Sequence, residues 1–162
     1  MNYFEDLAIG ERVELGSHTF SAEEIKTFAT RFDPQAFHTD EAAAARSLFG
    51  ALCASGWHTA AMWMRLWVER QKRQHAALRE KGEPIAAAGP SPGFRDLKWL
   101  KPVYVGDTIS YAMEIVETRP SARRPQWGLV TLLNTGANQK GELVLSFIST
   151  AFVERRSAQD RA

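Results

Sequence analysis

Residues 57–68 read WHTAAMWMRLWV, and this stretch decides the fold that we predict for the chain. Gly56 and Gly82 are the nearest glycines or prolines on its two sides, so residues 57–81 can form one uninterrupted helix. Only three of the first twelve residues are strongly polar, and a helix that is apolar nearly all round is buried on most faces. This pattern predicts a helix wrapped by a sheet. From Glu69 onward the helix turns polar, which indicates a solvated or substrate-facing end.

The part of the chain that follows this helix has the composition of β-strands. Four segments there are rich in β-branched and aromatic residues: Phe94–Leu100, Thr108–Thr118, Gly128–Asn134 and Leu143–Val153. Turn-forming residues lie in the short connections between the last three segments. Sequential strands joined by short loops pair antiparallel, so we expect a meander.

The part that precedes the helix is predicted to begin with a strand and a first helix. Val13–Phe20 alternates weakly between apolar and polar residues and fits an edge strand. Ser21 and Glu24 have the spacing of a capping box, in which each side chain binds the backbone N–H of the other residue. Apolar residues at helical spacing follow until Pro34, which ends the helix because the residue before a proline is pushed out of the helical conformation.

A turn and a second short helix are expected next. Residues Pro34–Phe37 form the predicted turn, which leads to His38. Thr39 and Asp40 are residue types that cap helices, so Glu41–Arg46 is predicted to be helical. The sum of these elements is an α+β domain, in which a late antiparallel sheet curls around one long early helix.

Length and composition fit one globular domain. The chain of 162 residues can bury a core without disulfides and is too short for two comfortable domains. An apolar fraction of 44% and a charged fraction of 24% exclude a mostly disordered, collagen-like or coiled-coil chain. No repeat or change of composition marks a boundary. We therefore predict a single domain over residues 1–153 and a polar tail over residues 154–162.

Charge and cysteine content narrow the classes of function. The 20 basic and 19 acidic residues leave a net charge of +1, which argues against a dedicated nucleic-acid-binding protein. Cys53 is the single cysteine, so an intramolecular disulfide and a four-cysteine zinc site are excluded. The four histidines lack short metal-ligand spacing, and no nucleotide-binding glycine loop occurs. Neither a metal nor a cofactor is expected.

The first ten residues, MNYFEDLAIG, contain two acids and no lysine or arginine, unlike the start of a signal peptide. No apolar run approaches the roughly 20 residues that cross a bilayer. We therefore expect a cytoplasmic protein that does not bind membranes.

Asp33 and His38, five residues apart across the proline turn, form the first candidate site. An aspartate and a neutral imidazole that share a water can hold it in position and take its proton. The same spacing also fits a structural role, in which Asp33 ends one helix and His38 precedes the cap of the next.

Ser55, Gly56 and Trp57, at the start of the long helix, form the second candidate site. Glycine lets a ligand approach the amides of the first turn, and their partial positive charge can stabilise a carbonyl oxygen that gains negative charge. Alternatively, Gly56 only relieves crowding where the helix meets the sheet. Trp63 and Trp67, further along the helix, are expected to pack in the core.

With these residues in view, the chain resembles the MaoC-like dehydratases, a family that includes the (R)-specific enoyl-CoA hydratases. Asp33 and His38 fall on the catalytic pair of that family, and Gly56 falls on the glycine whose amide receives the thioester oxygen. Phe49-Gly50 matches the family's turn, and Leu97–Val103 with Gly106–Thr108 resembles its strand pair, so the resemblance spans most of the chain. Three positions depart from the family pattern: Gln35, Ala36 and Ser55 stand where Asn, Pro and His are usual.

The resemblance implies a hotdog fold, paired as a homodimer or a dimer of dimers. It implies reversible hydration of a trans-2-enoyl-CoA thioester to a 3-hydroxyacyl thioester, without a cofactor. Asp33 and His38 would hold the attacking water, with Asp33 favoured as the base, and the Gly56 amide, beside Ser55 and Trp57, would stabilise the enolate-like oxygen. Nearby aromatic residues indicate a well-filled pocket: Phe32, Phe37, Phe49 and Trp57.

Two other functions stay open. A hotdog thioesterase would also use a carboxylate and an oxyanion site at a helix end, although the spacing of Asp33 and His38 disfavours it. A non-catalytic acyl-CoA-binding subunit would bind its ligand without turnover, and the three altered motif positions motivate this alternative.

Overall fold

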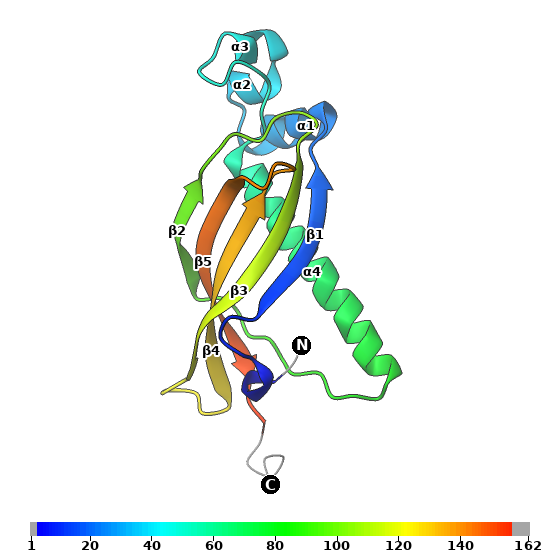
Figure 1. Ribbon diagram of the computed structural model, residues 1–162, viewed down its shortest axis with the longest axis vertical. Coiled ribbons are helices and arrows are strands. Elements are labelled where there is room, and N and C mark those ends of the chain that lie inside the picture. The colour runs from blue at the N-terminus through cyan, green and yellow to red at the C-terminus, as the bar shows by residue number, and fades with distance from the viewer. Residues whose placement is uncertain (1–2, 157–162) are drawn as a thin grey trace.

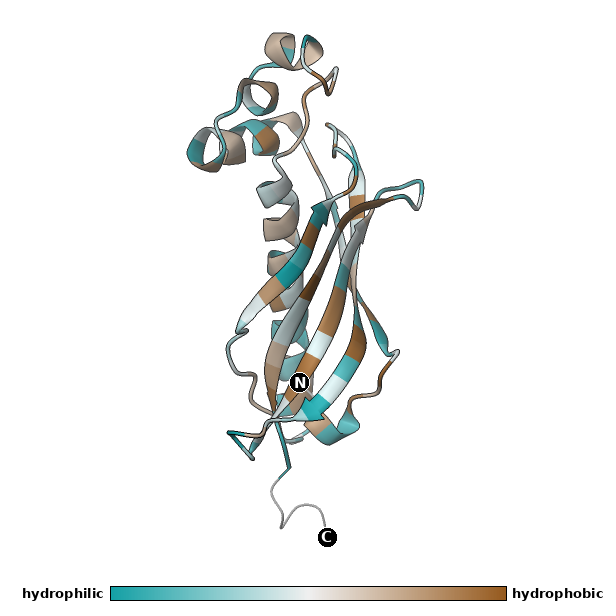
Figure 2. Ribbon diagram, turned by 90° about the vertical axis from the view of Figure 1, so that its left-hand side faces the viewer, coloured by the Kyte–Doolittle hydropathy of each residue, from teal (hydrophilic) through white to brown (hydrophobic). Residues whose placement is uncertain are grey.

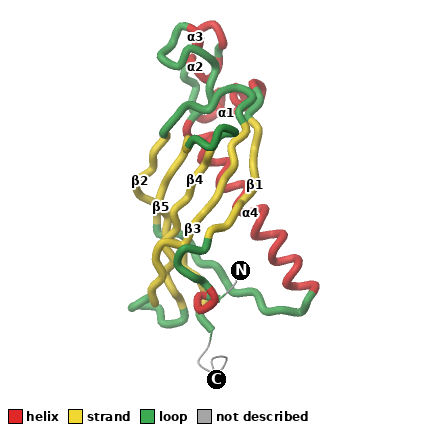
Figure 3. Tube along the Cα trace, viewed as in Figure 1, coloured by secondary structure: helices red, strands yellow, loops and turns green. Residues whose placement is uncertain are grey.

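The computed structural model describes residues 3–156. Its elements are η1 (Phe4–Asp6), β1 (Arg12–Thr19), α1 (Ala22–Phe32), α2 (Ala36–Thr39), α3 (Glu41–Ala45), α4 (Gly56–Glu80), β2 (Gly93–Trp99), β3 (Thr108–Pro120), β4 (Trp127–Ala137) and β5 (Leu143–Glu154). Five strands form one antiparallel sheet in the order β1-β3-β4-β5-β2, and α4 lies along one face of it (Figure 1 and Figure 3). The predicted α+β architecture is confirmed.

The sheet follows the predicted meander. Strands β3, β4 and β5 are neighbours both in sequence and in the sheet, and β1 lies at one edge as expected. Side chains on β4 alternate between half-buried and buried positions over most of its length, as a strand with one face on the core requires. Figure 2 shows apolar residues recurring along the strands, and buried residues of β3, β4, β5 and α4 share one core cluster.

The predicted first helix is confirmed together with its cap. The Ser21 hydroxyl accepts a hydrogen bond from the Glu24 amide at 3.2 Å, and the Glu24 carboxylate accepts one from the Ser21 amide at 3.3 Å. α1 ends at Phe32, and Asp33 is its C-cap, one residue before the proline. Asp33 is therefore fixed at the end of a rigid element.

Two details of the sequence prediction are wrong. The predicted turn Pro34–Phe37 is shorter than expected, because helix α2 begins at Ala36 and includes His38. α4 is also less buried than its composition suggests. Within α4 only His58, Thr59, Met62 and Trp63 are buried, whereas Trp57 and Met64 are 51% and 52% exposed. One sheet covers one side of this helix, and the apolar residues of the other side remain at the surface.

The C-terminal segment is anchored where the structure describes it. Glu154 ends β5. Arg155 pairs with Glu5 at 3.1 Å, and the Arg156 guanidinium binds both carboxylate oxygens of Asp6 at 2.7 and 2.8 Å. Residues 157–162 of the predicted tail lie outside the described residues. Within residues 3–156, no helix combines the length and the apolar character needed to cross a membrane.

Candidate active site

One cavity of about 420 Å³ brings together most of the residues selected from the sequence. Asp33 follows α1, His38 lies in α2, and Gly56 begins α4. The cavity lies at the end of the molecule where the short helices sit beyond the sheet (Figure 1). Its other lining residues are Gln35, Phe37, Phe49, Cys53, Ala54, Trp57, Thr59, Trp99, Leu100, Lys101, Pro102, Val103 and Val144.

Two hydrogen bonds hold the Asp33 carboxylate. The buried Ser55 hydroxyl donates to Oδ2 at 2.7 Å, and the Gln35 side-chain amide donates to Oδ1 at 2.8 Å. Burial acts to raise the pKa of Asp33, but these two donors and the adjacent His38 outweigh it and hold the pKa below its usual value. Asp33 is therefore ionised at neutral pH and able to accept a proton.

The orientation of the His38 ring follows from one contact. Its Nδ1 lies 2.7 Å from the carbonyl oxygen of Cys53. A carbonyl only accepts, so Nδ1 carries the hydrogen, and in the neutral ring Nε2 is left as an acceptor. Nε2 lies 3.5 Å from Asp33 Oδ2, which is longer than a direct hydrogen bond. Two acceptors thus face each other across a gap that a water donating to both would bridge.

The N-terminus of α4 opens into the same cavity. The Ser55 side chain caps the helix by accepting from the Trp57 amide at 3.2 Å. Gly56, the first helical residue, has an amide that no carbonyl within the helix can pair. The alternative interpretation of Gly56 also has support, because a Cβ at this position would lie less than 3.0 Å from three atoms of the Trp99 indole ring.

Three of the four aromatic residues that were expected near the site line the cavity. Phe37, Phe49 and Trp57 line the cavity as expected, but Phe32 does not, since it is 69% exposed and lies with α4 residues such as His58 and Met62 in a separate hollow. Trp99, from the end of β2, lines the cavity but was not predicted as a site residue. Trp99 is 43 residues after Gly56 and reaches it only through the pairing of β2 in the sheet, and local sequence patterns do not specify such a long-range contact.

Cys53 is not suited to be a nucleophile. Its side chain is buried, with Sγ 3.7 Å from His38 Nδ1. Burial raises the pKa of the Cys53 thiol to about 11, so the reactive thiolate is scarce at neutral pH. Asp33 and His38 are therefore stronger candidates than Cys53 for chemistry in this cavity.

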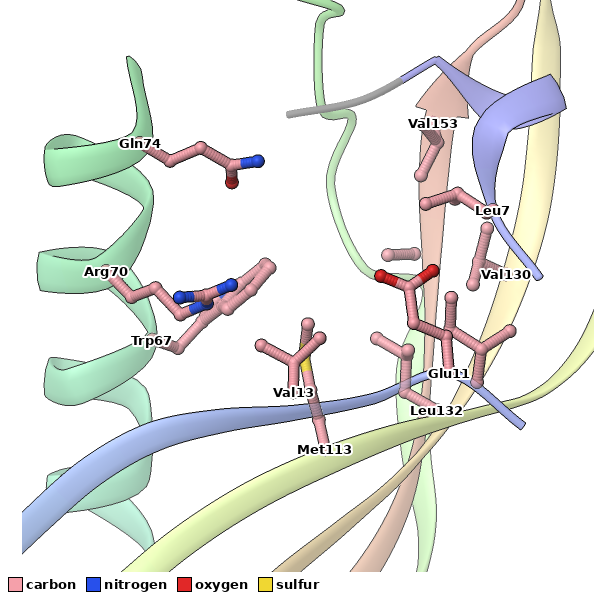
Figure 4. A pocket seen from close by; sticks show the side chains of 12 residues that line it. Leu7, Glu11, Val13, Trp67, Arg70, Gln74, Met113, Val130, Leu132 and Val153 are labelled. Carbon is pink, nitrogen blue, oxygen red and sulfur yellow. The ribbon is translucent and has the colours of Figure 1, made fainter. Parts of the chain in front are cut away.

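A second, smaller cavity of about 80 Å³ lies between the later turns of α4 and the sheet (Figure 4). Trp67, Arg70 and Gln74 face it from the helix, and its lining shares no residue with the first cavity. It contains one carboxylate, Glu11, and no histidine. An acid–base pair is thus found in the first cavity and not in this one.

Replacing Ser55 with alanine tests the electrostatics of the site. A hydrogen bond to a carboxylate stabilises the charged form, so its loss in Ser55→Ala is expected to raise the pKa of Asp33. The free energy of unfolding should fall by about 1–3 kcal/mol, because the carboxylate loses a donor. A ¹³C NMR titration of the Asp33 carboxyl and a denaturant melt measure the two effects. Ser47→Ala, which removes a hydroxyl that donates to the Ala44 carbonyl and accepts from the Phe49 amide, is the matched control. An unchanged pKa would contradict the assigned contact.

Comparison with known proteins agrees with this architecture. A model of the MaoC like domain matches residues 5–136. The chain is 30% identical over 136 residues to the uncharacterized protein YdeM of Bacillus subtilis, covering 84% of this chain and 87% of YdeM. The MaoC-like dehydratase from Rhodospirillum rubrum has a similar crystal structure, with 36% identity, a TM-score of 0.79 and coverage of 97% of this chain and 99% of that one.

A shorter match connects the chain to a named hydratase. Identity to the mesaconyl-CoA hydratase of Cereibacter sphaeroides is 33% over 64 residues, which are 40% of this chain. The match covers only 18% of that hydratase, so it concerns a segment and not the whole enzyme. The domain match, in contrast, extends over most of this chain. The protein therefore belongs to the MaoC-like dehydratase family and has its hotdog fold.

Proposed function

We propose that the protein is a hydratase that interconverts a trans-2-enoyl-CoA thioester and a 3-hydroxyacyl-CoA thioester. The observation that carries the proposal is the pair of facing acceptors, Asp33 Oδ2 and His38 Nε2, 3.5 Å apart beside the open N-terminus of α4. Family membership and the segment shared with a mesaconyl-CoA hydratase support the reaction class and the CoA thioester.

The pair would hold and activate the attacking water. One water hydrogen is donated to Asp33 and the other to His38, which directs an oxygen lone pair toward the β-carbon of the substrate. As the new C–O bond forms, one of the two residues takes a proton from the water. Asp33 is our choice for this base, because Ser55 and Gln35 keep it ionised.

The start of α4 would stabilise the charge that develops at the other end of the substrate. Attack at the β-carbon moves the electrons of the double bond toward the carbonyl, whose oxygen becomes enolate-like. The Gly56 amide and the partial positive charge of the helix N-terminus would bind this oxygen. Transfer of the proton taken from the water, by the Asp33–His38 pair, to the α-carbon then completes the addition of one water molecule across the double bond.

A crotonyl-CoA assay tests this function. The conjugated enoyl absorbance should fall as wild-type protein hydrates the double bond, with no release of free thiol. Thiol release would instead indicate a thioesterase. Binding of acyl-CoA, measured by a rise in melting temperature, without loss of the enoyl absorbance would indicate a binding subunit and contradict the proposal.

We also propose that the protein forms a homodimer through the uncovered side of α4. Trp57, Ala61, Met64 and Val68 are exposed apolar residues, spaced so that they form one stripe along the helix. Strand β2, whose last residue Trp99 contacts Trp57 at the start of α4, is an edge of the sheet. A stripe of this kind on a single copy is suited to packing against an equivalent surface, and a two-fold axis would match the stripe to itself.

A charge in the stripe is expected to separate the copies. Met64→Glu would bury a carboxylate in the proposed interface, so we expect a monomer by sedimentation analysis where wild type is a dimer. Arg73→Glu is the matched control, since residue 73 lies about 180° around the helix from residue 64. The same mass for Met64→Glu and wild type would contradict this interface.

A further inference from the structure

Trp99 and Gly56 are in unusually close contact at the catalytic cavity. A side-chain carbon at Gly56 would overlap the indole ring, with three ring atoms less than 3.0 Å from the ideal Cβ position. The Trp57 ring meets Trp99 edge-on, with centroids 5.1 Å apart. Trp99 and Trp57 are 46% and 51% exposed and line the cavity. The ring of Trp99 therefore occupies the place where any other residue at position 56 would have its side chain.

The sheet holds Trp99 in this place. Trp99 is opposite Leu145 of β5, which is fully buried, so its side chain points to the side of the sheet that faces α4. The next amide, that of Leu100, donates to the carbonyl of Val144 at 2.9 Å and fixes the end of β2. The register between β2 and β5 shifts between Arg95 and Lys98, just before Trp99, and such bulges redirect the side chains that follow.

We propose that Trp99 is a positioning residue of the hydratase, acting through the first turn of α4. The indole ring holds the Gly56 peptide in place and excludes water from its flank. An amide in a drier, fixed setting stabilises a developing oxyanion more than an amide in water, because the local dielectric constant is lower and no reorganisation is needed. This inference rests on the proposed hydratase function. It also unites the two explanations of Gly56. The glycine makes room for the Trp99 ring, and that ring in turn holds the amide that would bind the oxyanion.

Four variants, compared in hydration kinetics and in thermal melting, test the role of Trp99: Trp99→Ala, Trp99→Phe, Gly56→Ala and the double variant Gly56→Ala/Trp99→Ala. For Trp99→Ala we expect kcat to fall about tenfold with KM nearly unchanged, a smaller effect than the 10²–10³ loss typical of removing an oxyanion donor. Trp99→Phe should recover most of kcat because an aromatic ring still covers Gly56. Trp127→Ala, at the far end of β4, is the matched control and should leave kcat unchanged.

The double variant separates positioning from general packing. Gly56→Ala alone should be worse than Trp99→Ala in both kcat and melting temperature, because its methyl group clashes with the ring. Removing the ring should relieve the clash, so the double variant should recover to the level of Trp99→Ala. An active wild type with an equally active Trp99→Ala, or additive effects in the double variant, would overturn the role of Trp99. A wild type without hydration activity would overturn the proposed function itself, and the melting data would still show whether Trp99 and Gly56 are coupled.

Discussion

The Asp33→Asn variant is expected to lose about 10³-fold in kcat/KM for hydration, within the range measured for general acid–base groups. The amide has the size of the carboxylate and can still accept from Ser55, but it cannot take a proton from water. The asparagine oxygen can accept from only one of the two donors that hold Asp33, but the residue is not part of the apolar core, so the fold should persist. Steady-state kinetics and circular dichroism of the purified variant measure the two effects.

Asp96→Asn is the matched control for this variant. Asp96 is an exposed aspartate of β2 that does not line the cavity of Asp33 and His38. It has a positive φ of 56°, a conformation that asparagine also tolerates. The control should keep wild-type kcat/KM. Asp33→Asn with wild-type activity would exclude Asp33 as the base.

Replacing His38 with alanine is expected to reduce kcat/KM by about 10²-fold or more and also to lower stability. The centroid of the His38 ring lies 4.5 Å from that of the Phe37 ring, and the Nδ1–H of His38 donates to the buried carbonyl of Cys53. Loss of that donor leaves the carbonyl without its partner, which costs about 1–3 kcal/mol. His75→Ala, near the far end of α4, is the control for histidine loss. A fully active His38→Ala would contradict the water-holding role, whatever its stability.

Two of the three departures from the family pattern gain a physical meaning in the structure. Gln35 and Ser55, which stand where Asn and His are usual, are the two residues that donate to Asp33. With Gln35 and Ser55 in place of the usual Asn and His, the Asp33 carboxylate is therefore still held by two hydrogen bonds and stays ionised. This arrangement supports an active site over a binding subunit that has lost its chemistry.

Local sequence signals predicted the elements that local interactions determine. The capping box of Ser21 and Glu24 fixed the start of α1, and Pro34 fixed its end, because both act within a few residues. The placement of Asp33 at a helix end followed from these two signals. The resemblance to a family then indicated that His38 and Gly56 would share a cavity with Asp33, and they do.

Features that depend on long-range packing were beyond the reach of local patterns. Trp99 reaches Gly56 only because β2 pairs with β5 in one register, which a linear pattern does not specify. The exposure of Met64 was missed for a related reason. Periodicity shows that a helix face is apolar, but it does not show whether the same chain or another copy covers that face. The placement of Phe32 outside the cavity likewise depends on how α1 packs on its neighbours.

The most direct test of the central claim is to follow the oxygen of the attacking water. Wild-type protein is incubated with crotonyl-CoA in water enriched in ¹⁸O, and the products are analysed by mass spectrometry. We predict 3-hydroxybutyryl-CoA that carries ¹⁸O at its hydroxyl group, with the thioester intact. Free CoA together with a carboxylate that carries the ¹⁸O would show attack at the carbonyl and would contradict the account.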